Sequence, residues 1–288
     1  MSTSPANVGL ATAGSGAARE WLAVVRAVTR RQFVTLLRYQ ASFWASLASP
    51  FLSLAVAMFL AKAFAGAAGP EGFAASSGTA DFRSYLTLSV LFWAFVESQL
   101  SFGFGLLGEM ERGTLESLFL TPMPRSAYLV GMALYSFART GLSVGLTLAA
   151  GLLVFGIEPP FNPAWAVGLT VLNLVVVHGY GLVLAAVVLL VRSGAFTYAW
   201  GSVLPLLAGQ TFSVGLLPAP LRAISAALPL TYGLDALRWA FSGARPAFPL
   251  GLEVAVLALS AVALPAIGLA LFGRVERIAR QRGSFGQF

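Results

Sequence analysis

A short polar stretch, residues 108–126 with the sequence GEMERGTLESLFLTPMPRS, separates two long apolar segments of the chain. Three acids in this stretch, Glu109, Glu111 and Glu116, lie close in sequence to Arg112. Charged side chains at this density need water or a polar partner. We therefore expect this loop to meet a polar surface.

The same loop carries the signals of one short helix. Thr114 is placed to cap a helix over residues 115–120, and Pro122 and Pro124 prevent its continuation. The apolar side chains along one side of this helix are Leu115, Leu118 and Phe119. A helix held between two membrane spans is suited to receive a push from a soluble partner, because its displacement must move both spans. The alternative is a compact turn with no such role.

Two charged residues fall inside apolar segments. Glu97 and Arg139 stand at similar distances along the chain from residues 108–126, which predicts a similar depth in the membrane. An unpaired charge near the bilayer centre costs about 2.5–3.5 kcal/mol on insertion scales, so such groups normally face a partner or a cavity. We expect an ion pair between the two helices; a water-lined or substrate pathway and snorkelling are the alternatives.

Composition argues against metal, thiol and nucleotide chemistry in this chain. It has no cysteine and one histidine, His178, which excludes thiolate sites and histidine-rich metal clusters. Lys62 stands between two alanines, whereas a phosphate-binding P-loop needs its lysine between Gly and Ser or Thr. We expect Asn173 and Tyr180 to satisfy a buried His178 imidazole, in preference to proton transfer or ligand binding. No catalytic residue, metal site or cofactor site is expected.

Two short motifs resemble enzyme signatures but lie in apolar segments. Residues 103–108 match G-x-G-x-x-G without a preceding strand, and residues 141–145 match G-x-S-x-G without a strand-turn-helix around Ser143. An intramembrane hydrolase using Ser143 is the weakest function that we consider. We expect Gly141 and Gly145, at i and i+4, to let another helix approach closely.

The elements that position these residues are membrane helices. The 288-residue chain is 58% hydrophobic and only 10% charged, with a mean hydropathy of +0.81, whereas soluble domains are about 25% charged. Apolar stretches of about 20 residues predict an all-α integral membrane protein with six transmembrane helices. The predicted spans are about 41–63, 84–107, 127–155, 164–190, 196–216 and 250–272. Basic residues are scattered among them, so the net charge of +7 does not indicate nucleic-acid binding.

The rest of the chain divides around one transmembrane domain, residues 19–275. Residues 1–18 are small and polar and are expected to form a disordered tail, not a signal peptide. Residues 276–288 are expected to form a basic cytoplasmic tail. Most arginines fall on the side of the two termini, which the positive-inside rule places in the cytoplasm.

Two segments are helical in pattern without being spans. Over residues 19–38, Arg19, Arg26 and Arg30 share one helix face opposite apolar residues, which predicts an amphipathic helix along the inner membrane surface. That helix is expected to bind membrane lipids, a cytoplasmic partner or both. Prolines break residues 217–243 into pieces too short to cross a bilayer, so this backbone must be buried in protein or line a wet cavity.

Two separated motifs resemble one protein family. Residues 111–116 (ERGTLE), followed by Thr121 and Pro122, are similar to the E-R-x-x-G-T-L-E…(S/T)-P signature of ATP-binding cassette (ABC) exporter permeases of the type-2 integral membrane family. Arg112 directly precedes Gly113, where many members insert residues. A second block, LPLTYGLDALR, resembles that family's P-L-T-Y-x-x-(D/E)-x-L-R motif and supplies Pro229, Thr231, Tyr232, Asp235 and Arg238. The resemblance covers about residues 20–275.

The resemblance implies that transport and ATP hydrolysis are carried out by separate subunits. Residues 108–122 would be the coupling helix, which docks on a separate ABC ATPase that binds ATP and magnesium. The implied coupling residues are Glu109, Glu111, Arg112, Gly113, Thr114, Leu115, Glu116, Leu118 and Phe119. Two ATPase copies and a second permease chain, identical or similar, would complete the transporter, with the first and fifth spans as its dimer surface. Residues 217–243 would be short extracellular re-entrant helices. The protein would be located in a bacterial inner membrane.

A separate ATPase is not the only energy source that we consider. Glu97, Arg139 and His178 are ionisable groups inside spans, and such groups also serve as proton relays. The alternative function is therefore a proton-coupled secondary transporter or channel. Asp235 and Arg238 stand at i and i+3, and we expect them to form a local ion pair with each other in preference to contacting substrate. The expected substrate is a hydrophobic small molecule, a lipid-like compound or a glycan.

Overall fold

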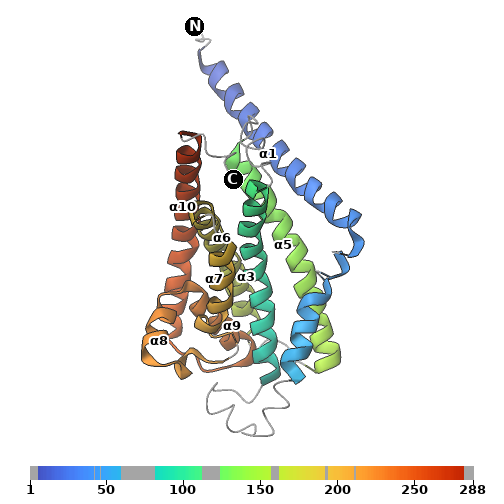
Figure 1. Cartoon of the computed structure of the whole chain (residues 1–288), viewed down its shortest axis with the longest axis vertical. Helices are drawn as coiled ribbons and strands as arrows, with labels where there is room; N and C mark the ends of the chain where they lie inside the picture. Colours follow the sequence, from blue (N-terminus) through green and yellow to red (C-terminus); the bar gives the residue numbers. More distant parts are fainter. Residues whose placement is uncertain are drawn as a thin grey trace, which may run out of the picture.

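The computed structural model describes residues 6–41, 43–45, 47–59, 82–111, 124–156, 162–191, 194–210 and 212–281. These residues form helices and connecting turns, and no β-strand occurs among them. The helices are α1 (Ala6–Arg38), a segment Phe43–Phe59, α3 (Phe82–Glu111), α5 (Arg125–Ala150) with its π-helical extension (Gly151–Phe155), α6 (Pro163–Val191), α7 (Gly194–Leu207), α8 (Ala219–Ala226), α9 (Pro229–Ser242) and α10 (Leu250–Gln281). The long helices lie side by side, with α1 and the end of α10 at one end of the bundle and α8 and α9 at the other (Figure 1).

Several of these helices have the length and composition of membrane spans. Ser126–Val154, Pro163–Val188 and Leu250–Val275 each qualify within the described chain, and the bent pair of Gly16–Arg38 and Phe43–Phe59 adds a fourth if it counts as one span. α3 has 30 residues and is therefore about 45 Å long, more than the hydrocarbon core of about 30 Å. The predicted all-α integral membrane class is confirmed, whereas the number of six spans stays a prediction.

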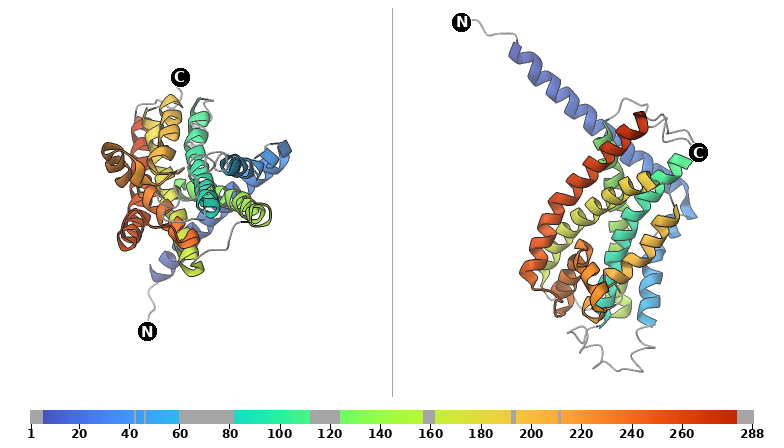
Figure 2. Two further views of the ribbon diagram at one scale, coloured as in Figure 1. Left: turned by 90° about the horizontal axis from the view of Figure 1, so that it is seen from below. Right: turned by 60° about the vertical axis from the view of Figure 1, so that its left-hand side comes forward.

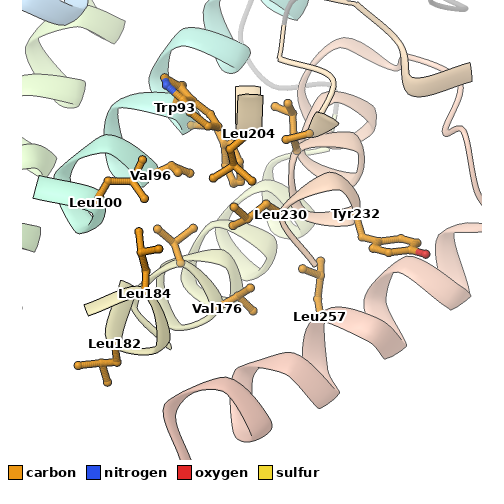
Figure 3. Packing of buried hydrophobic residues seen from close by; sticks show 14 of the residues in the cluster. Trp93, Val96, Leu100, Val176, Leu182, Leu184, Leu204, Leu230, Tyr232 and Leu257 are labelled. Carbon is orange, nitrogen blue, oxygen red and sulfur yellow. The ribbon is translucent and has the colours of Figure 1, made fainter. Parts of the chain in front are cut away.

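The centre of the bundle is α6, which is apolar around its whole circumference and is packed by α3, α9 and α10. Figure 3 shows side chains from α3, α6, α7, α9 and α10 converging there. Val96, Leu204, Leu230 and Leu257 are fully buried in this cluster.

Glycines let α6 and α10 approach closely. A Cβ atom at Gly179 would lie 2.6 Å from Cδ of Pro265, and one at Gly268 would lie 2.6 Å from Cβ of Leu182. By contrast, nothing in the described chain lies within 4 Å of a Cβ placed at Gly141 or Gly145. These two glycines of α5 therefore make no close contact with another described helix of this chain, and the expectation that they let another helix approach stays a prediction.

The fifth predicted span is shorter than expected. Residues 196–216 were expected to be one helix, but α7 ends at Leu207. The N–H of Gly209 bonds to the carbonyl of Leu206, and the N–H of Gln210 bonds to that of Pro205. With Gly209 at φ 73°, this is a Schellman ending, which only a residue tolerant of positive φ permits. The ending leaves the Gln210 carbonyl available to α9.

The ends of the chain extend the predicted helices. α1 begins at Ala6, inside the segment expected to be a disordered tail, and projects from the bundle (Figures 1 and 2). α10 continues to Gln281, into the segment expected to be a basic tail. The division into tails and one transmembrane domain stays a prediction.

Candidate functional site

The predicted coupling residues lie at the junction of α3 and α5. Glu109 and Glu111 end α3, while Arg112, Gly113, Thr114, Leu115, Glu116, Leu118 and Phe119 lie outside the described residues. The end of α3 and the start of α5 lie at the same end of the bundle as α1 (Figure 1). The described residues on either side of this loop therefore lie at the end of the bundle where α1 packs against α5.

α1 is attached to the first turns of α5 by specific contacts. Trp21 Nε1 donates to Ser126 Oγ at 3.0 Å, and Thr29 Oγ1 donates to the Gly131 carbonyl at 3.0 Å. A Cβ at Gly131 would lie 2.9 Å from Cβ of Val28, so glycine is what lets the two helices touch. A displacement of the start of α5 must therefore carry α1 with it.

The two faces of α1 differ as the predicted amphipathic pattern requires. Val25 is buried and Val28 is half-buried against α5, whereas the arginines predicted to share the opposite face are exposed: Arg19, Arg26 and Arg30. The face that meets α5 is thus apolar, and the charged face points away from the bundle.

A chain of polar side chains joins three helices in the middle of the bundle. Ser98 Oγ on α3 lies 3.0 Å from Ser136 Oγ on α5, and Gln99 Nε2 donates to the same Ser136 oxygen at 3.1 Å. Gln99 Oε1 lies 3.1 Å from His178 Nδ1 on α6, which places the donated proton on that nitrogen. Phe137 packs edge-on against the imidazole, with ring centroids 5.4 Å apart. The cluster fixes α3 against both neighbours.

His178 is satisfied by a different partner than the sequence suggested. Asn173 Nδ2 instead donates to the Gly233 carbonyl of α9 at 3.3 Å, and the Tyr180 hydroxyl accepts from Trp200 Nε1 of α7. The expected partners were wrong because Asn173 and Tyr180 point from α6 to other helices, while Gln99 of α3 lies beside the imidazole. A glutamine beside a serine in an apolar span was the available signal for it.

Glu97 and Arg139 are not joined to His178 by the hydrogen bonds of this cluster. The Glu97 side chain is exposed on α3 and accepts a hydrogen bond from the Trp93 side chain. The contact between Ser98 and Ser136 sets the two helices so that Glu97 and Arg139 differ in height by about 3 Å, from the rise of 1.5 Å per residue. The two residues therefore stand at similar heights in the bundle, while their depth in the membrane and their pairing stay predictions.

The second polar cluster surrounds Arg238 on α9, in the block that contains Pro229, Thr231 and Tyr232. Arg238 is 1% exposed and its guanidinium donates to Ser89 Oγ at 2.6 Å and to the Gln210 carbonyl at 2.7 Å. Its Cζ lies 3.9 Å above the centre of the Tyr85 ring. Burial lowers the pKa of Arg238 from its usual value, while Tyr85 and Asp235 oppose that shift. One cation therefore ties α9 to α3 and to the end of α7.

Asp235 and Arg238 make their hydrogen bonds with other groups. Asp235 Oδ2 accepts from the Ala247 backbone N–H at 2.5 Å, which closes the loop between α9 and α10. Tyr232, one turn before, donates its hydroxyl to the Ala226 carbonyl at 2.7 Å and so fixes α8 to α9. These residues hold the short helices in place, and α9 is buried along nearly its whole length.

Comparison with known families places this geometry in a wider group. A family model described as ABC-2 type transporter matches residues 23–242, from within α1 to the last residue of α9. The match includes residues 108–126 and the Arg238 cluster. A search of curated proteins finds no match.

Proposed function

The chain belongs to the ABC-2 type transporter family and is a transmembrane subunit of an ABC transporter, and from this premise we propose that it is the membrane half of an exporter. Permeases of this family work with an ABC ATPase partner. The membrane is a bacterial inner membrane with both chain termini on its cytoplasmic side. Two copies of the ATPase bind ATP and magnesium, and two permease chains enclose the substrate path. The substrate is a hydrophobic small molecule, a lipid-like compound or a glycan.

The observation that carries the coupling role is the attachment of α1 to α5 beside the loop 108–126. When ATP closes the ATPase dimer, the coupling helix over residues 108–122 is displaced, and the helices on both sides of it must follow. α5 carries α1 through Trp21 and Thr29. α3 pulls on α6 through Gln99 and His178.

The same displacement reaches the opposite end of the bundle through α3. Ser89, near the other end of that helix, accepts from Arg238 of α9. A movement of α3 along its axis is therefore transmitted to the re-entrant helices α8 and α9. This arrangement suits a transporter in which ATP hydrolysis at one membrane face opens a path at the other.

Affinity purification of the full chain from its native membrane tests this proposal. We expect a co-purifying ATPase whose activity vanadate inhibits, and we expect Glu116→Arg to abolish co-purification while the chain stays inserted. Glu158→Arg, in a loop predicted to lie on the other side of the membrane, is the matched control and should keep the ATPase bound. Isolation of the chain with no ATPase, in membranes that still transport, would instead support proton coupling through Glu97, Arg139 and His178.

A further inference from the structure

The first turn of α10 carries an acid in an unusual place. Glu253 is fully buried, at 0% exposure. Both of its carboxyl oxygens are buried without a hydrogen-bond partner of standard geometry among the described residues. An ionised carboxylate in such a place is costly, because burial has removed the water that would solvate its charge. The site therefore needs either another bound species beside the carboxylate or a carboxyl group that is protonated and neutral.

The neighbour of Glu253 is a second acid. The groups that act on its carboxyl are the side chain of Asp235 and the backbone N–H of Phe248. Asp235 is itself 9% exposed, and its Oδ2 atom already accepts from the Ala247 N–H. Two carboxylates side by side in a buried site repel each other, and one of them is then held protonated.

Only one positive charge is placed to balance these two acids among the described groups that interact with them. Arg238 acts electrostatically on Asp235 from one turn along α9, and its own hydrogen bonds go to Ser89 and Gln210. The other titratable groups at this site are Tyr85 of α3 and Tyr232 of α9, which are neutral phenols at ordinary pH.

α6, which packs against both α9 and α10, adds no charge there. α6 brings Asn173 to α9, and its titratable side chains are hydrogen-bonded elsewhere, His178 to Gln99 and Tyr180 to Trp200. α8 also packs against α9, and the side chain of its one arginine, Arg222, is exposed. One negative charge is therefore matched by Arg238, and a second would be unmatched.

We propose that Glu253 holds a proton and donates it to Asp235, so that this carboxyl pair is a proton-binding site that fastens α9 to α10. The hydrogen stays on Glu253, the second oxygen of Asp235 accepts the bond, and the single remaining negative charge is balanced by Arg238. The site lies at the end of the bundle opposite the coupling loop, where it holds the re-entrant helix against the last long helix (Figure 1). It does not depend on the transport function proposed above.

Infrared spectroscopy of the full chain in lipid nanodiscs tests where the proton is. At about pH 7 to 8, where exposed carboxyls are ionised, the wild-type chain should show the C=O stretch of a protonated carboxyl. Glu253→Gln should remove that band, and Glu20→Gln, an exposed acid on α1, should leave it unchanged. Identical spectra for the wild-type chain and Glu253→Gln in this region would overturn the proposal.

The pH dependence of thermal unfolding gives a second readout. The folded chain holds a proton that the unfolded chain releases, so the Tm of the wild-type chain should fall by a few degrees for each pH unit between about pH 5 and about pH 8. Glu253→Gln keeps a donor toward Asp235 without a titrating group and should flatten this slope, as Glu20→Gln should not. Equal slopes for the wild-type chain and Glu253→Gln would contradict the site.

A variant at the partner acid keeps the test decisive if Glu253→Gln does not fold. In Asp235→Asn, the amide donates to Glu253, whose charge is then balanced by Arg238, so no proton is required. We expect this variant to lose both the infrared band and the slope of Tm against pH. Retention of both would show that the proton lies elsewhere and would overturn the assignment.

Discussion

A buried arginine holds the short helices at one end of the bundle. Arg238 has two oxygen partners and an aromatic face around its guanidinium, and all three come from other helices or turns. A charge with that set of partners is tolerated in a buried site, whereas the loss of a single member leaves the others unsatisfied.

Replacement of this arginine should therefore be costly. We expect Arg238→Met, which keeps the volume of the side chain, to destabilise the protein by about 3 kcal/mol or more, because Ser89 and the Gln210 carbonyl lose their donor. Arg245→Met removes an exposed arginine nearby and should change the Tm little. Thermal unfolding of both variants in detergent measures the difference; equal Tm values would show that the buried contacts contribute nothing.

The contact between Gln99 and His178 is the second test at this scale. Gln99→Leu leaves the imidazole N–H without its acceptor and should cost about 1–3 kcal/mol. In the double variant Gln99→Leu/His178→Phe both polar groups are gone, so the loss should be smaller than the sum of the single losses by about 0.5 kcal/mol or more. Denaturation of the wild type, the two single variants Gln99→Leu and His178→Phe, and the double variant gives the coupling free energy between the two side chains. Losses of stability that add exactly would refute the contact.

Among the helices, α3 makes the polar connections that matter most for transmission. It is bonded to α5 through Ser98 and Ser136, to α6 through Gln99, and to α9 through Ser89. It also ends at Glu111, within the segment that we propose as the coupling helix. A rigid helix with contacts at both ends transmits an axial displacement, because a packed interior deforms little.

The seam between α1 and α5 can be opened at one glycine. Gly131→Val places a branched side chain where a Cβ alone already lies 3.0 Å from the Val25 carbonyl, so α1 should separate from α5. Gln32 Nε2 and Met132 Sδ are 3.1 Å apart, so in the variant Gln32→Cys/Met132→Cys a short thiol-reactive bifunctional reagent should cross-link the two cysteines, in a chain that has no cysteine of its own. We expect Gly131→Val to abolish this cross-link.

A neighbouring glycine supplies the matched control for that experiment. Gly141→Val lies on the same helix with nothing of the described chain within 4 Å, and it should leave the cross-link between α1 and α5 intact. If Gly131→Val and Gly141→Val cross-link equally well, the close seam does not hold α1 in place.

For the whole molecule, the proposed dimer surface consists of the first and fifth spans. On α7, Val203 is 45% exposed, and on the segment Phe43–Phe59, Val56 is 58% exposed. We expect a single Val203→Cys to cross-link two chains in membranes, because the partner permease covers this face. Val262→Cys, 74% exposed on α10, is the control and should stay monomeric on oxidising gels. Cross-linking at position 262 but not 203 would move the dimer surface to α10.

Much of the architecture could be predicted because it depends on local properties. The lengths of apolar runs predict helices at 84–107, 127–155, 164–190 and 250–272, and each lies within or across a helix of the structure. The boundary of α7 was wrong because Gly209 ends the helix through hydrogen bonds that hydropathy does not register. The family was evident from two short motifs, one of which lies outside the described residues except for Glu111.

The sequence by itself determined the membrane class, the amphipathic character of α1 and the family, because apolar run length, charge spacing and motif order are written along the chain. Tertiary structure alone decided which polar groups meet. Ser89 and Arg238 are 149 positions apart, and Gln99 and His178 are 79 apart. Glu253 attracted no notice in the sequence because its environment consists of α9 and the loop before α10. Burial and partnership belong to the packed bundle, and they exist only after distant helices have come together.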